Sequence, residues 1–176
     1  VTPTAAITNN YISRLINDGL GNPDVVFVHG GGNDHTKNLA FFFVDANTGR
    51  QYAMQGGTYY LTDSDLNQVF GPADAAKDYE AAKAFVDTTF TTAVVKMLRL
   101  VQTRYPQAML YYYPSDSMSE PMMAACKKIC QHMNVTCLPV REYATLKCQD
   151  GSKHPSVEGM EQLAEVVWNL IYKDFQ

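Results

Sequence analysis

The residues best suited to chemistry follow a short apolar run near the start of the chain. Val25–Val28 contains only Val and Phe, which suit a pleated sheet, and predicts a buried strand over 25–29. Gly30–Gly32 come next, and glycines accept positive φ and let backbone approach a ligand closely. Asn33 and Asp34 then follow, where open parallel sheets place their ligand crevices. The stretch therefore predicts a crevice at the carboxyl end of this strand.

A second stretch near the other end of the chain contains a histidine and an acidic residue, in the order Asp150-Gly151-Ser152-Lys153-His154-Pro155. An acyl transfer needs a base within hydrogen-bond reach of its nucleophile, and histidine is the usual base. It also needs donors aimed at the place where negative charge develops. Together the two stretches suggest an acyl-transfer site in which the nucleophile is missing.

The elements that must position these residues alternate along the chain. We predict strands at 25–29, 108–113 and 135–140, and helices at 5–18, 73–104, 119–133 and 156–174, with a small hairpin of 41–45 and 50–54 inside a long connection. Ser119 is the predicted N-cap of its helix, ahead of Pro121. The last helix carries an apolar face made of Leu163, Val166, Val167, Leu170 and Ile171. Strands alternating with helices predict an α/β fold with a parallel sheet.

Both stretches resemble blocks of the SGNH (GDSL-type) hydrolases. The sequence from Pro23 to Asp34 resembles the family's block that ends in Gly-x-Asn-Asp, and Asp150–Met160 resembles its final Asp-x-x-His-Pro block. The resemblance covers the chain from about residue 5 to its end. It implies a three-layer α/β/α sandwich with a parallel sheet, flavodoxin-like, in a single domain over 1–176. That domain would lack its first strand or strands and would carry an insertion around 35–72.

The resemblance also implies a role for particular residues. Asn33 would donate its side-chain amide to the oxyanion, and Gly31 would form the tight turn that positions it. His154 would be the general base for a serine, and Asp150 would orient its imidazole. Gly32 and Asp34 lie in the same crevice and are predicted to contact the substrate.

The chain departs from the family pattern in two places. Asp150 precedes His154 by four residues rather than three, with Lys153 as the apparent insertion. The Gly-Asp-Ser block that carries the family's nucleophile is absent. Ser13 lies on a predicted helix, where it is interpreted as a surface residue. The other serines are assigned to no strand-to-helix elbow; they are Ser64, Ser115, Ser117, Ser119, Ser152 and Ser156. Without the nucleophile strand, Val25–Val28 would form an exposed apolar edge, so we expect an N-terminal segment or a complementing chain to supply that strand.

Two functions of different classes follow from this pattern. The first is a serine esterase or acetylesterase that hydrolyses a carboxylic ester, of a small molecule or an acylated carbohydrate, and needs no cofactor. The alternative is a non-catalytic SGNH-like module that binds a glycan or a protein partner through the same crevice. A flavodoxin-like phosphate site is disfavoured, because Asp34 would repel the phosphate.

Charge and composition narrow the partners. The formal net charge is −4, with no basic block, which argues against nucleic acid and anionic membranes as partners. The sequence contains no apolar run long enough to cross a bilayer. The histidines show no metal-ligand spacing, so we predict no metal site.

Four cysteines lie close together in the sequence, at Cys126, Cys130, Cys137 and Cys148. Cys126 and Cys130 are one helical turn apart, which favours no bridge between them. Either the cysteines are buried free thiols, or a disulfide joins Cys137 or Cys148 to another cysteine. A disulfide would indicate an oxidising compartment, periplasmic or extracellular.

Overall fold

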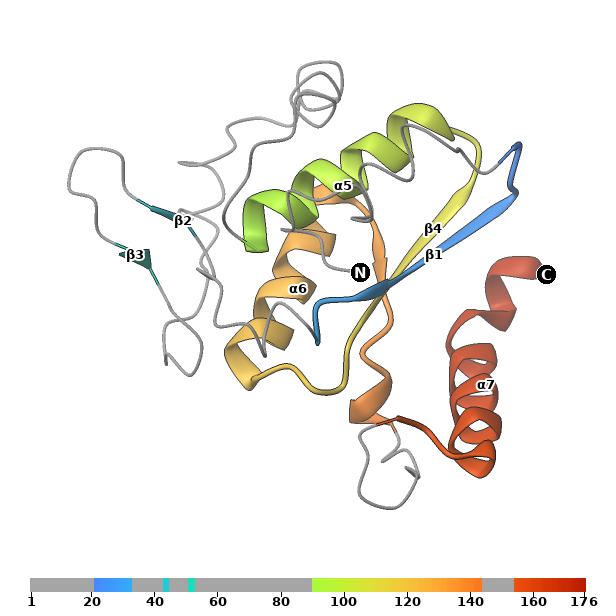
Figure 1. The fold of residues 1–176 in the computed structure, drawn as a ribbon. Helices are drawn as coiled ribbons and strands as arrows, with labels where there is room; N and C mark the ends of the chain where they lie inside the picture. The colour runs from blue at the N-terminus through green and yellow to red at the C-terminus, as the bar shows by residue number, and fades with distance from the viewer. Residues whose placement is uncertain (1–20, 33–42, 45–50, 53–89, 144–153) are drawn as a thin grey trace. The chain divides into compact units, whose positions relative to one another are not determined.

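The computed structural model describes residues 21–32, 43–44, 51–52, 90–143 and 154–176 (Figure 1). The chain divides into two compact units, Val1–Cys137 and Leu138–Gln176, and each is described by itself. The predicted helix at 5–18 and the first part of the one at 73–104 lie outside the described residues. The expectation of a single domain over 1–176 stays a prediction.

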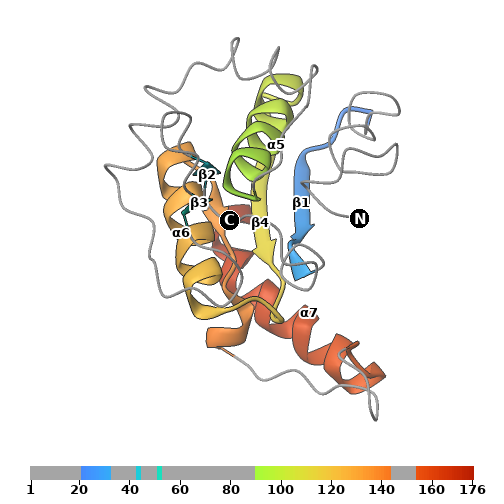
Figure 2. The ribbon, with the colours of Figure 1, turned by 60° about the vertical axis from the view of Figure 1, so that its left-hand side comes forward.

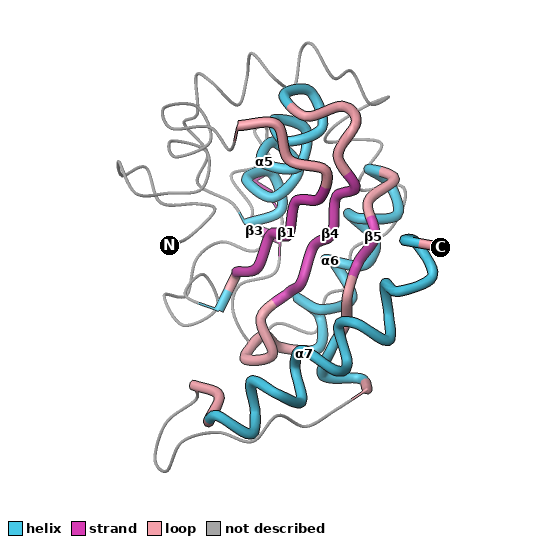
Figure 3. Tube along the Cα trace, turned by 90° about the vertical axis from the view of Figure 1, so that its right-hand side faces the viewer, coloured by secondary structure: helices cyan, strands magenta, loops and turns pink. Residues whose placement is uncertain are grey.

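The first unit contains a three-stranded parallel sheet in the order β1-β4-β5 (Figures 1 and 3). Its strands are β1 (Val25–Gly30), β4 (Met109–Pro114) and β5 (Thr136–Cys137). The parallel α/β architecture predicted from the sequence is confirmed. Within the described residues β1 pairs with β4 alone, so its other edge carries no described strand.

Two helices lie together on one side of this sheet, as Figure 2 shows: α5 (Phe90–Arg104) and α6 (Glu120–Met133). Side chains from α5, α6 and the sheet form one apolar core, which includes Val26, Val28, Phe90, Leu98, Tyr112, Met122 and Ile129. Because most apolar positions of α5 are fully buried, this helix behaves as a core element. The sheet and these helices are two of the three predicted layers.

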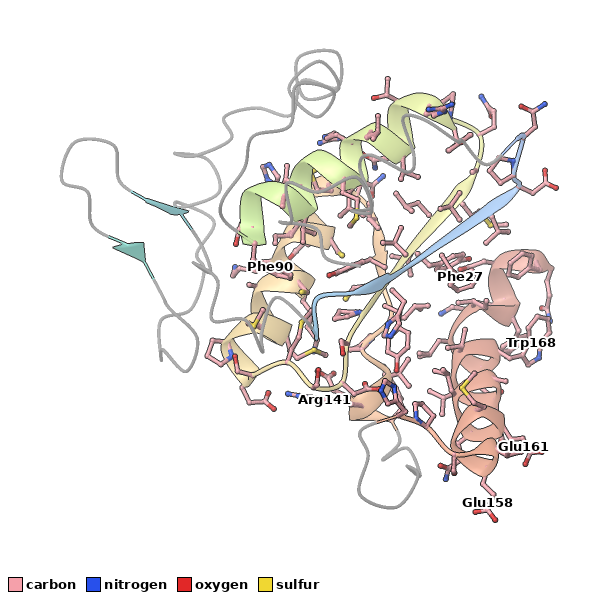
Figure 4. The ribbon with its side chains drawn as sticks, viewed as in Figure 1. Phe27, Phe90, Arg141, Glu158, Glu161 and Trp168 are labelled. Carbon is pink, nitrogen blue, oxygen red and sulfur yellow. The ribbon has the colours of Figure 1, made fainter. Side chains whose placement is uncertain are left out.

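The three consecutive tyrosines of β4 divide between the two faces of the sheet, as the two-residue period of a strand requires. Tyr112 belongs to the core beneath α5 and α6. Tyr111 points to the opposite face, where its ring stacks on Phe27 with centroids 5.0 Å apart. Figure 4 labels Phe27 on β1 and Phe90 at the start of α5, on opposite sides of that strand.

The strand predicted over 135–140 is wrong in length. β5 ends at Cys137, and a short 3₁₀ turn, η1 (Val140–Glu142), follows. Pro139 has no backbone N–H to donate to a sheet, so the apolar run of the sequence cannot continue as a paired strand. The predicted hairpin is confirmed, since β2 (Phe43–Val44) pairs antiparallel with β3 (Gln51–Tyr52).

Helix α6 begins as predicted, with Ser119 at the N-cap and Pro121 in its first turn, but the Ser119 side chain makes no capping hydrogen bond. The helix ends at Met133, and its C-cap Asn134 adopts the left-handed conformation with φ +54°. Its N–H donates to the carbonyl groups of Cys130 and Gln131, and asparagine tolerates this conformation well.

Cys126, Cys130 and Cys137 take part in no disulfide, and Cys148 lies outside the described residues. Cys126 and Cys130 are therefore not joined to each other, as the sequence predicted. A hydrogen bond with Cys137 and burial raise the pKa of the Cys130 thiol far above its ordinary value. This thiol therefore stays protonated and is a poor nucleophile at neutral pH.

The second unit contains η1, α7 (Val157–Ile171) and the short η2 (Tyr172–Phe175). Ser156 caps α7, because its hydroxyl oxygen accepts a hydrogen bond from the Gly159 N–H at 3.1 Å. On the face predicted to be apolar, Ile171 is buried and the other four residues are half-buried. No helix in the described part of the chain is long and apolar enough to cross a membrane.

Candidate active site

The carboxyl ends of β1 and β4 lie side by side. The parallel register pairs His29 with Tyr113 and Gly30 with Pro114. Beyond the last pair, the Ser115 N–H donates to the Gly30 carbonyl at 3.0 Å, so the ladder extends past the strand ends. The residues that leave β1 and those that leave β4 therefore reach the same edge of the sheet, where parallel sheets bind ligands.

Gly31 adopts a backbone conformation that favours glycine. Its φ is +98°, a conformation that other residues rarely adopt. A methyl group built on its Cα would collide with the Met118 side chain and lie 3.1 Å from the ring of Phe90. The backbone of the turn therefore packs directly against the core side chains, as a tight exit from the strand requires.

Gly32 packs against two serines of the connection between β4 and α6. A Cβ built on Gly32 would lie 2.7 Å from Ser115 Oγ and 2.8 Å from Ser117 Oγ. The two hydroxyl oxygens are 3.0 Å apart and share a hydrogen bond. The backbone of the glycine turn is thus bordered by hydroxyl groups on one side and by Met118 and Phe90 on the other.

Next to this turn, the other face of the sheet carries a polar aromatic group. The His29 ring stacks on Tyr113 with centroids 4.2 Å apart, and its Nδ1–H donates to the Tyr113 carbonyl at 2.9 Å. The Tyr113 hydroxyl donates to Asp116 Oδ2 at 2.5 Å. Burial, this hydrogen bond and the charge of Asp116 raise the pKa of the Tyr113 phenol, which therefore stays neutral.

The residues predicted for catalysis are only partly among those described. Gly31 and Gly32 lie in the first unit, where the glycine turn closes the end of β1. His154 lies in the second unit, where it is exposed and comes shortly before the Ser156 cap of α7. The other predicted site residues, Asn33, Asp34 and Asp150, lie outside the described residues. The roles assigned to all six stay predictions.

The sequence reasoning missed the neighbours of the glycine turn. It placed Ser115 and Ser117 between a predicted strand and a predicted helix but assigned them to no strand-to-helix elbow, and it did not predict their contact with Gly32. The signal was present, because a polar segment directly after a parallel strand reaches the same edge as the Gly30–Gly32 stretch. Met118 and Phe90 gave no such signal, since nothing in an apolar residue type marks its contact with a distant glycine.

Among the residues of known placement, no group of three His, Cys, Asp or Glu side chains is arranged to hold a metal ion. The described part of the candidate site thus consists of backbone, two hydroxyl groups and the His29–Tyr113–Asp116 group. Backbone and hydroxyl groups of this kind can orient a polar substrate and donate hydrogen bonds to a developing negative charge.

A family model of GDSL-like lipases/acylhydrolases matches residues 72–171 of the chain. Among solved structures, the chain is similar to a candidate GDSL-like lipase from Bacteroides uniformis, with a TM-score of 0.61 and 23% identity over 94% of this chain and 59% of that one. A candidate GDSL-like lipase from Bacteroides ovatus gives a TM-score of 0.59 and 23% identity over 93% of this chain and 60% of that one. No curated protein matches the chain. The chain thus shares the fold of these structures and spans less than two thirds of their length.

Proposed function

The chain belongs to the GDSL-like lipase/acylhydrolase family, and on this premise we propose that it contributes the oxyanion turn and the general base of a serine esterase. The substrate would be a carboxylic ester, with acetylated carbohydrates as the class to test first. The observation that carries the proposal is the Gly31 turn at the carboxyl end of β1, where φ is +98° and favours glycine, and which is followed, after Gly32, by Asn33.

The proposed reaction is an ordinary two-step acyl transfer. A serine hydroxyl attacks the ester carbonyl while His154 accepts its proton, and the carbonyl oxygen becomes an oxyanion held by the Asn33 side-chain amide. The bond to the leaving alcohol breaks as His154 returns the proton to it. Water then attacks the acyl-enzyme by the same path and releases the acid. Asp150 orients the imidazole, and Gly32 and Asp34 contact the substrate.

We propose that the nucleophilic serine comes from a strand that pairs with the edge of β1 opposite β4, carried by an N-terminal segment or a complementing chain. Two observations support this. β1 pairs with β4 alone among the described strands, and the chain spans 59% of the length of one similar structure. An apolar strand at the edge of a sheet invites pairing with another strand. The coding sequence upstream of Val1 is the direct check, because it either contains a Gly-Asp-Ser block after an apolar run or does not.

The test uses the protein with its complete coding sequence, 4-nitrophenyl acetate and an acetylated oligosaccharide. We expect hydrolysis of both esters, and the variants His154→Ala and Asn33→Ala should lower kcat by about 100-fold or more. A matched control is His132→Ala, since His132 lies in the last turn of α6 and has no proposed role. Turnover that survives His154→Ala unchanged would contradict the proposal.

A second candidate function is a non-catalytic module that binds a glycan or a partner through the same crevice. The four-residue spacing from Asp150 to His154 favours it, because this spacing departs from the family's catalytic pattern. In that case, glycan binding by isothermal titration calorimetry would be the same in the parent protein and in His154→Ala, and neither would hydrolyse an ester.

A further inference from the structure

Three consecutive glycines, the last residue of β1 and the two that follow it, contact the connection between β4 and α6. The Gly30 carbonyl accepts the Ser115 N–H at 3.0 Å. Gly31 lies against the Met118 side chain. Gly32 lies against the hydroxyl groups of Ser115 and Ser117. Each of the three glycines therefore has its own contact with one short loop.

The contact at Gly32 is polar, unlike the contact at Gly31. The built Cβ of Gly32 comes within 2.7 Å and 2.8 Å of the two hydroxyl oxygens, and within 3.3 Å of Ser115 Cβ. Both serines are half-buried, and the hydrogen bond between their hydroxyl groups ties each side chain to the other. A hydrogen-bonded pair restricts the rotamers of both side chains, so it forms a firmer surface than either serine alone would.

We propose that Ser115 and Ser117 are positioning residues for the proposed esterase reaction, and that their paired hydroxyl groups fix the backbone of Gly32 as it enters Asn33. This inference rests on the proposed function, because Asn33 is the proposed oxyanion donor. An oxyanion donor works only within a narrow range of distances to the developing charge, so a small shift of the turn lowers the rate. The serines act through the turn and do not touch the reacting atoms.

The test measures kcat and KM of the complete protein with 4-nitrophenyl acetate. The variants are Ser115→Ala, Ser117→Ala and the double substitution. We expect kcat to fall about 10-fold to 100-fold while KM changes little, since a misplaced donor affects the transition state alone. The double variant should be no worse than the worse single variant, because either change breaks the same pair. Ser119→Ala is the matched control in the same loop, since its side chain makes no capping hydrogen bond.

A second pair of variants separates the hydroxyl group from the space it fills. Thr and Val have nearly the same shape, but only Thr keeps the hydroxyl. We expect Ser117→Thr to retain a kcat several-fold higher than that of Ser117→Val. Equal losses in the two variants would indicate that packing alone matters, and would overturn the positioning role of the hydroxyl pair.

The remaining outcomes distinguish this inference from the proposed function. If the parent protein hydrolyses the ester and the serine variants match Ser119→Ala, the positioning role is wrong and the proposed function stands. If the parent protein hydrolyses no ester, the proposed function fails and the positioning role fails with it. If a fluorophosphonate probe labels the parent but not Ser115→Ala, or not Ser117→Ala, that serine is the nucleophile, and the positioning role is likewise overturned.

Discussion

Substitution of Gly31 by alanine tests the central structural claim about the turn. Gly31 has φ +98°, and a further carbon atom on its Cα would require the end of the Met118 side chain and the Phe90 ring to shift. The alanine methyl group would meet the Met118 side chain and lie 3.1 Å and 3.3 Å from two ring atoms of Phe90. Two separate costs are therefore expected, one from the backbone conformation and one from packing.

The two costs can be estimated from the geometry. A left-handed conformation costs an L-residue about 1–2 kcal/mol. Forcing an extra carbon into a packed core costs about 1–3 kcal/mol more. Gly31→Ala should therefore lower the free energy of unfolding by about 2–5 kcal/mol, a large part of the roughly 5–15 kcal/mol that stabilises a typical domain.

The assay is urea denaturation followed by far-UV circular dichroism, with Gly21→Ala as the matched control. Gly21 also has positive φ, at +70°, but a Cβ built there meets nothing within 4 Å. The control therefore carries only the conformational cost, about 1–2 kcal/mol. The difference between the two variants isolates the packing against Met118 and Phe90.

Equal losses of stability in the two glycine variants would refute the packing argument. A second check is Met118→Ala in the Gly31→Ala background, which removes the atom that the new methyl group meets. Met118→Ala alone should cost about 2–5 kcal/mol, because it empties a buried site. The double variant should lose less than the sum of the two single losses, and strict additivity would contradict the proposed contact.

Three further predictions concern described residues elsewhere in the protein. Ser156→Ala should lower the free energy of unfolding by about 1 kcal/mol through loss of the α7 cap, whereas Ser119→Ala, which breaks no side-chain cap, should cost less in the same urea titration. The pKa of Tyr113 is raised above its ordinary 10.0 in the folded protein, so the folded state holds this proton more tightly, and the stability it contributes is present below pH 10 and lost as the pH rises above it. Relative to Tyr113→Phe, the unfolding free energy should fall by up to about 1.4 kcal/mol per pH unit above pH 10. Parallel profiles for the two proteins would show that burial and the contact with Asp116 do not raise this pKa. Cys130 is buried and its thiol has a raised pKa, so it should resist alkylation by iodoacetamide at pH 8 in the folded protein and react in urea. Peptide mass spectrometry measures the alkylation, and equal alkylation in both states would contradict the burial of Cys130.

Local sequence patterns predicted most of the described elements. The run Val25–Val28 became β1, and the pattern over 108–113 became β4 with a shift of one residue. Such strands can be predicted from neighbouring residues alone. The spacing of their apolar residues and the turn residues at their ends both lie within a short segment of the chain. The strand predicted over 135–140 was too long, because the prediction gave more weight to the apolar residues of this segment than to Pro139. The lack of an N–H at Pro139 ends the ladder whatever its neighbours are.

In the candidate site, too, some features were predictable from the local sequence and others were not. The glycine stretch and the His154 block were singled out from residue types and order, and the catalytic roles assigned to them stay predictions. The contacts of Gly31 and Gly32 were not predictable, since Phe90, Ser115 and Met118 are far from them in the sequence. A sequence states that a glycine is present but gives no measure of the space around its Cα.

By itself, then, the sequence determined the α/β class, the parallel strands and the family resemblance, because these follow from periodicity and from short motifs. Only the tertiary structure decided that the exit of β1 rests on the loop after β4, and that two serines border the turn. Both facts depend on the register of β1 against β4, which is fixed by packing across the sheet and joins residues more than 80 positions apart, such as His29 and Tyr113. No local pattern in the chain encodes that register.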